Sequence, residues 1–334
     1  MSTAIGPLSG DALLAWHGPL LVALNTDPMA GRNNVTYFDV RGSPPCLVRQ
    51  ISLQRDGEST GANPRGYLSV GPRKGYVARA GLDSIAIVDP EAGAITGIID
   101  LAPFRGDGAR AWPTALARVG PHAWVTLSRL PAGLLHPTAR GAIAMIDPTT
   151  DRVVDRDPDV PGTQVIELSH PDPVGTLRTL GSRVLVACVG DYQRIDDGAI
   201  EAIDTVSLRA DTLVTERQVQ GNLDAVLPLD DDRLLLRVVS QADAGLAIEF
   251  SRLVEWSLSR HMVLRTWITA PGYSLTEPIL GRDGRVYVGD RGQESTQRPH
   301  GIRVFDAATG NELTTVPIDV GLQPYYLTEE PPEM

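Results

Sequence analysis

Short apolar runs, separated by turns rich in Gly, Pro, Asn and Asp, recur along the whole chain. In the segment "GIRVFDAATGNELTTVPI", residues 301–318, apolar positions alternate up to an Asp, a small polar turn follows, and a second extended run begins. Nearly the same pattern occurs in "DSIAIVDPEAGAITGIIDL" and in "GAIAMIDPTTDRVVDRD". Alternation that is interrupted by turn residues in this way predicts β-hairpins.

The hairpins repeat at intervals of 49 to 58 residues. An Asp usually ends the first strand, where its side chain can accept hydrogen bonds from backbone N–H groups further along and so start the turn. Each hairpin is preceded by two more apolar runs, so each repeat predicts four short strands. The residues at the aligned position are Asp39, Asp89, Asp147, Asp204, Ser257 and Asp306.

Six repeats of four antiparallel strands predict an all-β protein, a β-propeller with six blades, and seven blades is the alternative. No amphipathic segment of helical length lies between the strands, which argues against βαβ units. We therefore predict a single propeller domain over residues 1–334. Its N- and C-terminal segments are expected to close the ring, and the C-terminal "LQPYYLTEE" has the pattern of an additional inner strand.

Composition narrows the range of partners. The 334 residues carry a net charge of −11, and the basic residues are scattered rather than clustered. Because nucleic-acid binders present a basic face, we expect no nucleic-acid partner. No apolar run is long enough for a transmembrane segment, and no signal peptide is visible. The compartment stays open between the cytoplasm and, if a leader was removed, the periplasm or the exterior. We expect a monomer.

The repeats resemble those of the YVTN-type bacterial β-propellers, whose hairpins carry a V-I-D-x-x-T motif. The matching segments are "IAIVDPEAG", "IAMIDPTTD" and "IRVFDAATG", together with an x-Pro pair before the inner strand, as in "ANPRGYLSV". This resemblance covers nearly the whole chain and implies the fold and a periplasmic or secreted location, but the motif is structural and implies no activity. The six-blade count is also similar to that of the regucalcin/gluconolactonase family, without a continuous sequence match.

Long loops predict which face of the propeller carries function. Five loops are long and varied, whereas the turns at the other ends of the strands are mostly tight. These loops are "NTDPMAGRNN", "SRLPAGLLHPTARG", "VGDYQRIDDG", "VSQADAGLAIEFS" and "GDRGQESTQRPHG". Binding residues usually lie on long loops that a rigid scaffold positions. We therefore expect the site on this face, over the central channel, ringed by residues that precede the inner strands. The predicted ligand-binding residues are Asn63, Arg65, Trp112 and Gln323.

Three carboxylates are assigned to the same ring of positions: Asp172, Asp224 and Glu277. Converging carboxylate and amide oxygens suit Ca²⁺, which takes six to eight oxygen ligands. Regucalcin-like enzymes hold their metal with such a set, and the resemblance implies Glu277, Asp172, Asp224 and Asn63 here. The alternative is that these side chains only cap backbone N–H groups.

Cysteines and histidines add little chemistry. Cys46 and Cys188 lie in repeats on opposite sides of a six-fold ring, too far apart for a disulfide, so both are expected to be free thiols. His17 falls at a tight turn and is expected to be exposed. A metal site is not predicted from the histidines, which come from different repeats.

Two functions remain open at this point. No GxSxG, P-loop or HExxH motif is present, so the leading hypothesis is a non-enzymatic binding or scaffold protein that holds a protein or small-molecule ligand on its long-loop face. The alternative is a Ca²⁺-dependent hydrolase or lactonase, in which the metal polarises a carbonyl and a carboxylate moves a proton. No catalytic residue is identified for it.

Overall fold

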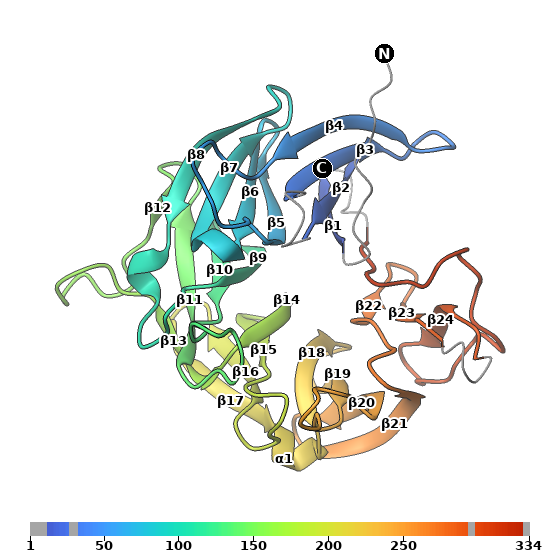
Figure 1. The fold of residues 1–334 in the computed structure, drawn as a ribbon. Helices are drawn as coiled ribbons and strands as arrows, with labels where there is room; N and C mark the ends of the chain where they lie inside the picture. The colour runs from blue at the N-terminus through green and yellow to red at the C-terminus, as the bar shows by residue number, and fades with distance from the viewer. Residues whose placement is uncertain (1–11, 27–32, 293–297, 330–334) are drawn as a thin grey trace. The chain divides into compact units, whose positions relative to one another are not determined.

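The computed structural model describes residues 12–26, 33–292 and 298–329, and the regular secondary structure in them is almost entirely β-strand, joined by turns and loops (Figure 1). The N-terminal residues 1–11 and parts of two predicted long loops, 27–32 and 293–297, lie outside the described residues. Helical structure in the described part is limited to one turn, α1 (Glu216–Val219), and to two short 3₁₀ segments, η1 (Ala80–Leu82) and η2 (Ala102–Phe104). No helix there is long and apolar enough to cross a membrane.

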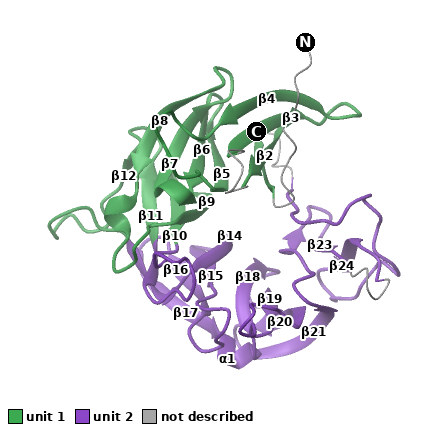
Figure 2. Cartoon of the chain, in the orientation of Figure 1, with its two compact units in different colours: residues 1–127, 143–165, 330–334 green, residues 128–142, 166–329 purple. Residues whose placement is uncertain are grey.

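The chain divides into two compact units (Figure 2). Unit 1 comprises residues 1–127, 143–165 and 330–334, and it holds most of the first three sheets. In each of them neighbouring strands follow chain order. The first sheet contains β1 (Leu13–His17), β2 (Leu20–Asn25), β3 (Asn34–Asp39) and β4 (Cys46–Ser52); the second contains β5 (Pro64–Gly71), β6 (Lys74–Arg79), β7 (Ser84–Asp89) and β8 (Ala94–Asp100); the third contains β9 (Pro113–Val119), β10 (His122–Leu127), β11 (Arg140–Asp147) and β12 (Arg152–Val153).

Unit 2 comprises residues 128–142 and 166–329 and holds the other three sheets. These also keep chain order, as Figure 1 shows. The fourth sheet contains β14 (Pro173–Leu180), β15 (Arg183–Cys188), β16 (Ala199–Asp204) and β17 (Ala210–Thr215); the fifth contains β18 (Asn222–Pro228), β19 (Arg233–Val239), β20 (Phe250–Ser257) and β21 (Met262–Pro271); the sixth contains β22 (Ile279–Leu280), β23 (Arg285–Asp290) and β24 (Gly301–Asp306). A further strand, β13 (Ile166–Pro171), pairs with β11 and is the fifth strand of the third sheet.

The predicted class, an all-β propeller of six antiparallel blades, is confirmed, with differences in the last blade. Its sheet has three regular strands, because the expected outer strand makes only two isolated bridges, Ile302 with Ile318 and Phe305 with Glu312. Pro317 lies within that segment and lacks the N–H that a regular ladder needs. The expected strand in "LQPYYLTEE" is absent from its described part, residues 322–329.

The repeated turn residues sit where the sequence pattern predicts. The five aspartates end β3, β7, β11, β16 and β24, and Ser257 ends β20. Asp204 Oδ1, for example, accepts hydrogen bonds from the backbone N–H groups of Val206 and Ser207 at 3.1 and 2.7 Å. Ser257 Oγ accepts from Arg260 N at 3.2 Å. The hydrogen bonds to Asp204, of which the one from Ser207 N–H has the largest effect, hold the pKa of Asp204 below its usual range.

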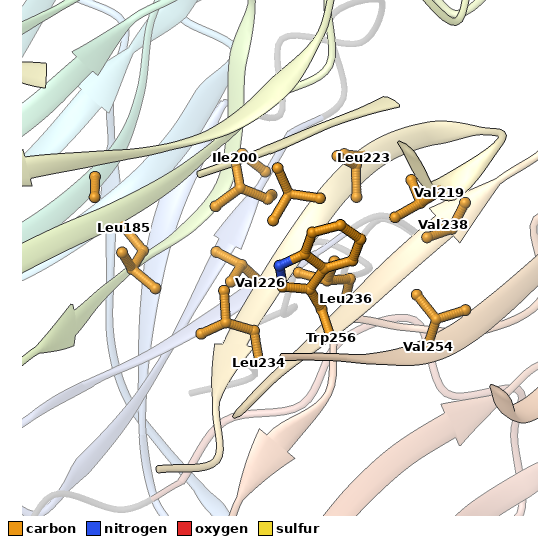
Figure 3. Close-up of a cluster of buried hydrophobic side chains, with 13 residues drawn as sticks. Leu185, Ile200, Val219, Leu223, Val226, Leu234, Leu236, Val238, Val254 and Trp256 are labelled. Carbon is orange, nitrogen blue, oxygen red and sulfur yellow. The ribbon is translucent and has the colours of Figure 1, made fainter. Parts of the chain in front are cut away.

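The hydrophobic core lies between neighbouring sheets. Within unit 2, Leu234, Leu236 and Val238 of β19 join a cluster that also contains Trp256 and residues of the fourth sheet (Figure 3). The intervening Leu235 points to the opposite face and joins a second cluster, with residues of the sixth sheet. Successive side chains of a strand alternate between faces, so the continuous apolar run of β19 serves two cores at once.

Two expectations about single residues have different outcomes. Cys46 is exposed and Cys188 is buried, and both are free thiols, as predicted. The exposure of His17 was predicted wrongly, since its side chain is only 5% exposed. Its Nε2 lies 2.8 Å from the carbonyl oxygen of Pro72 and its Nδ1 lies 2.7 Å from the hydroxyl of Tyr67, so two hydrogen bonds within the protein replace solvation.

Replacing Asp204 by Ser should make folding stability less dependent on pH. Because the pKa of Asp204 is lowered in the folded state, its stabilisation is present above the unfolded pKa of about 4 and is lost as pH falls below it. The wild type should therefore be more stable than Asp204→Ser at pH 7, and the difference should shrink towards pH 2 in denaturant titrations. Asp211→Ser, at an exposed strand position, is the control and should show no such convergence. A difference that stays constant with pH would contradict the turn assignment.

Trp256 gives a test of the core. Its buried Nε1–H has no hydrogen-bond partner in the described part of the chain, whereas Trp267 Nε1 donates to the buried Glu255 carboxylate at 2.8 Å. Trp256→Phe should therefore lower the free energy of unfolding by less than about 1.5 kcal/mol, while Trp256→Ala should lower it by about 3–5 kcal/mol. Trp267→Phe should be more harmful than Trp256→Phe, because it removes a bond to a charged group. The opposite ranking in urea unfolding would show this account to be wrong.

Candidate functional site

Three of the residues predicted to precede inner strands do so in the same backbone conformation. Asn63, Trp112 and Asp172 come directly before β5, β9 and β14, each is followed by Pro, and their φ angles are 45°, 50° and 49°. Positive φ is uncommon outside glycine, and here it turns the chain into the inner strand. Asn63 is buried, and its N–H donates to Asn33 Oδ1 at 2.8 Å.

Asp224 and Glu277 do not occupy that position, which corrects the alignment made from the sequence. In the fourth sheet, Val189 N donates to Asp172 O at 3.0 Å, and the equivalent bond of the sixth sheet runs from Arg291 N to Ser274 O, also at 3.0 Å. Glu277 therefore lies three residues further along. In the fifth sheet Asn222 pairs with Val239, just as Pro173 pairs with Cys188 in the fourth sheet. Gly221 therefore corresponds to Asp172, and Asp224 also lies three residues further along. Pairing with the next strand decides where each inner strand begins. An acidic residue near a predicted strand does not show that starting point in the sequence.

The other two predicted ligand residues are accessible. Arg65 is exposed on β5 in unit 1, and Gln323 belongs to unit 2, in the segment that follows the last strand. Gln323 Oε1 accepts a long hydrogen bond of 3.5 Å from the hydroxyl of Tyr325. A ligand-binding role for these two residues and for Asn63 and Trp112 stays a prediction.

A buried polar network surrounds Asp224. Arg237 Nε donates to Asp224 Oδ1 at 2.6 Å, and the Tyr273 hydroxyl donates to Oδ2, also at 2.6 Å. Tyr192 lies 3.4 Å from the same oxygen. Burial alone would lower the pKa of Arg237, but the Asp224 carboxylate outweighs it and raises that pKa. Hydrogen bonds within the protein satisfy both members of the pair, and both side chains are almost inaccessible to solvent.

Glu277 approaches the same inner strands. Its Oε2 accepts hydrogen bonds from Thr176 Oγ1 at 2.8 Å and from Thr176 N at 3.2 Å. Gly175 permits this approach, since a Cβ there would lie 3.0 Å from Glu277 Oε1 and 2.9 Å from Asp224 O. Burial, followed by the negative charge of Glu277, raises the pKa of the neighbouring Tyr326 to about 12. Asp224 and Glu277 thus lie beside β14, at the level of Gly175.

These positions bear on the predicted calcium site. Within residues 12–26, 33–292 and 298–329, no group of three or more His, Cys, Asp or Glu side chains is arranged to hold a metal ion. Both Asp224 oxygens accept bonds from protein donors, and so does Glu277 Oε2. The assignment of Asp172, Asp224 and Glu277 to Ca²⁺ stays a prediction.

A stack of arginine and tyrosine side chains leads from this network towards the surface. The guanidinium of Arg237 lies 5.0 Å from the ring centre of Tyr273, and that of Arg291 lies 5.6 Å from it. Arg291 also lies 4.3 Å from the ring of Tyr325, which is exposed. Sequence reasoning missed these residues. The available signal was the charge of Arg237 inside the otherwise apolar run "LLLRVV" of β19, because a buried charge requires a partner.

Three long loops of unit 2 are tied to one another. We call residues 128–139, 189–198 and 240–249 the linked-loop surface. His136 Nδ1 lies 2.7 Å from Asp191 Oδ2, which joins the first loop to the second. Gln193 Nε2 donates to Asp243 O at 2.9 Å, and Ala242 N donates to Tyr192 O at 2.7 Å, which joins the second loop to the third. Cross-loop bonds of this kind restrict the loops to one arrangement.

The linked-loop surface displays leucines in a strained conformation. Leu134 and Leu246 have φ angles of 61° and 64°, and their side chains are 38% and 48% exposed. Leu135, beside the first of them, is 53% exposed. The left-handed region costs a non-glycine residue of order 1 kcal/mol, and such residues concentrate at sites of function. Because these side chains are exposed, burial in the core does not compensate for the cost of their backbone conformation.

Comparisons with known proteins identify the fold alone. No protein-family model matches the chain, and no curated protein matches it. Among solved structures, hydrazine synthase of Kuenenia stuttgartiensis is similar with a TM-score of 0.59 and 15% identity, covering 98% of this chain and 92% of that one. The structure titled U3-55K is similar with a TM-score of 0.56 and 12% identity, covering 94% and 86%.

Asp224→Asn should destabilise the protein strongly, because it leaves the Arg237 guanidinium buried without a counter-charge. Breaking a buried pair in this way lowers the free energy of unfolding by about 3–5 kcal/mol. The double variant Asp224→Asn, Arg237→Met should recover much of that loss. Denaturant titration of the wild type, Asp224→Asn, Arg237→Met and the double variant measures the coupling. Additive effects would contradict the pairing. Repeating the wild-type titration with Ca²⁺ and with a chelator tests the calcium assignment independently.

Proposed function

We propose that this protein is a non-enzymatic binding propeller that holds a partner protein on its linked-loop surface. The observation that carries the proposal is the pair of strained, exposed leucines, Leu134 and Leu246, on loops fastened to each other by hydrogen bonds. A surface that is already ordered loses little conformational entropy when it binds, so more of the contact energy appears as affinity.

Local turns present these leucines in matching ways. The backbone N–H of Leu134 donates to Pro131 O at 2.9 Å, and that of Leu246 donates to Asp243 O at 3.0 Å. Asp243 Oδ1 also accepts bonds from Gly245 N and Ala247 N at 2.8 and 2.9 Å. Each leucine therefore ends a hydrogen-bonded turn in the left-handed conformation. Asn would suit such a position with less strain, so the apolar side chain is better explained by binding than by folding.

The negative charge of the linked-loop surface favours a partner segment that is both apolar and basic. The three loops contain five carboxylates, Asp191, Asp196, Asp197, Asp243 and Glu249, against two arginines. Of the arginines, Arg129 is buried and paired with Glu167 of β13, so it adds little positive charge to the surface. Leucines on an acidic background match a peptide segment that carries both apolar and Lys or Arg side chains.

The resemblance to YVTN-type repeats supports a scaffold role but does not indicate a particular partner. A small-molecule ligand bound on the same face is the alternative to a partner protein. The hydrolase alternative has less support. The metal ligands assigned to it are Glu277 and Asp172, and Glu277 Oε2 already accepts a hydrogen bond from Thr176. Asp224, the third carboxylate of the predicted calcium site, is paired with Arg237.

Leu134→Asn and Leu246→Asn separate binding from folding. Asn tolerates positive φ, so each variant should be as stable as the wild type or up to about 1 kcal/mol more stable. Each should bind an apolar–basic peptide about tenfold or more weakly, because burial of a leucine at an interface contributes of order 1.5–3 kcal/mol. Fluorescence anisotropy with synthetic peptides of apolar–basic, apolar–acidic and polar composition measures the affinities.

The control is Val206→Asn. Val206 is 86% exposed but lies in the tight turn that follows β16, away from the three loops in sequence and in hydrogen bonding. It should leave peptide affinity unchanged. If no peptide class binds the wild type with a dissociation constant below about 1 mM, or if the two loop variants bind as well as the wild type, the proposal fails.

A further inference from the structure

A single buried carboxylate fastens the middle loop of the linked-loop surface to the sheet behind it. Glu216 opens α1 and is completely inaccessible to solvent. Its Oε2 accepts a hydrogen bond from Gly198 N at 3.0 Å, at the end of loop 189–198, and its Oε1 accepts one from Leu223 N at 3.1 Å, in β18. One side chain therefore joins a loop, a helical turn and an inner strand.

The local backbone is shaped around this carboxylate. A Cβ at Gly198 would lie 2.4 Å from Glu216 Oε1, so only glycine allows the close approach. The backbone repeats the connection, since Glu216 N donates to Gly198 O and Gly221 N donates to Glu216 O, both at 3.3 Å. The carboxyl group is thus the centre of a built junction.

The charges that face this junction are mainly negative. Asp196 and Asp197 approach from the loop. The thiol of Cys188 in β15 adds no charge, because burial raises its pKa. The nearby arginines are engaged elsewhere: Arg194 pairs with Asp196 and Asp197, Arg217 pairs with Asp196, and Arg252 of β20 donates to the carbonyl oxygens of Val219 and Gln220. No ion pair to Glu216 is found among the described residues.

Burial without a cation favours the neutral acid. It raises the pKa of Glu216 to about 8; the two backbone N–H donors oppose the shift, and the charges of Asp197 and Asp196 add to it. A folded-state pKa above the unfolded value means that the folded state holds its proton more tightly. The stabilisation is fully present below about pH 4.5, declines as pH rises, and is lost above about pH 8.

We propose that Glu216 is a proton-operated latch, which holds loop 189–198 against β18 while its carboxyl group is protonated and releases the loop as that group ionises. This regulates the linked-loop surface and, in its effect on partner binding, rests on the function proposed above. Opening lets water reach the carboxylate, so each rise of one pH unit between the two pKa values should favour the open state about tenfold.

Hydrogen exchange at the Gly198 and Leu223 amides tests the latch without any partner. After correction for the intrinsic pH dependence of exchange, protection at both amides should fall by about tenfold per pH unit between pH 5 and pH 8 and then level off. In Glu216→Gln the profile should be flat. Glu249→Gln, at an exposed position of the same surface, should follow the wild type.

Asp197→Asn gives a second test, which remains decisive if Glu216→Gln fails to fold. Removing one facing negative charge should move the levelling-off point of the protection profile to lower pH. Protection in the wild type that is independent of pH, or a profile that Asp197→Asn leaves unmoved, would overturn the latch.

The latch and the binding function fail separately. Peptide affinity that is measurable but insensitive to pH, together with flat protection, would remove the latch and leave the binding surface. Protection that depends on pH without binding of any peptide class would confirm the latch and remove the binding function proposed for the loops. If both hold, peptide affinity should fall over the same pH range as protection.

Discussion

The structure depends on burial of both faces of the middle strands of each blade. In β19 the side chains of Leu234, Leu236 and Val238 enter one core cluster and that of Leu235 enters the next. Each buried aliphatic side chain contributes of order 1.5–3 kcal/mol, so a blade without its neighbours would leave a large apolar area in water. This is why the repeats stabilise one another and why their strand order is uniform.

The same constraint explains the polar network at Asp224. Continued alternation along β19 puts position 237 on the face that Leu235 uses, and that position holds an arginine. A buried guanidinium must be paired and hydrogen-bonded, and Asp224, the hydroxyl of Tyr273 and the carbonyl oxygen of Leu275 meet that requirement. Tyr273 then supports Arg291, so one departure from the apolar pattern organises a series of side chains that ends at exposed Tyr325.

Buried carboxylates have a common role at the loop ends of unit 2. Glu201 accepts hydrogen bonds from the backbone N–H groups of Ser169 and His170, Glu216 accepts them from Gly198 and Leu223, and Asp290 accepts one from Gly292. Long loops leave backbone donors that no strand satisfies, and these side chains supply the missing acceptors. Glu201, Glu216 and Asp290 therefore have a structural role in common, which is to hold the ends of the loops in place.

The sequence by itself determined the blade, because hairpin signals act over a few residues: apolar alternation, an Asp that starts the turn, and glycine where φ is positive. It predicted Asp39, Asp89, Asp147, Asp204 and Asp306 in equivalent turns, and it predicted two free thiols. Tertiary structure alone decided the rest. The positions of Asp224 and Glu277 follow from strand register, the burial of His17 follows from its bonds to Tyr67 and Pro72, and the joining of three loops follows from contacts up to 55 residues apart along the chain. Local patterns carry no record of such contacts, because the partner of each group is chosen by packing between sheets.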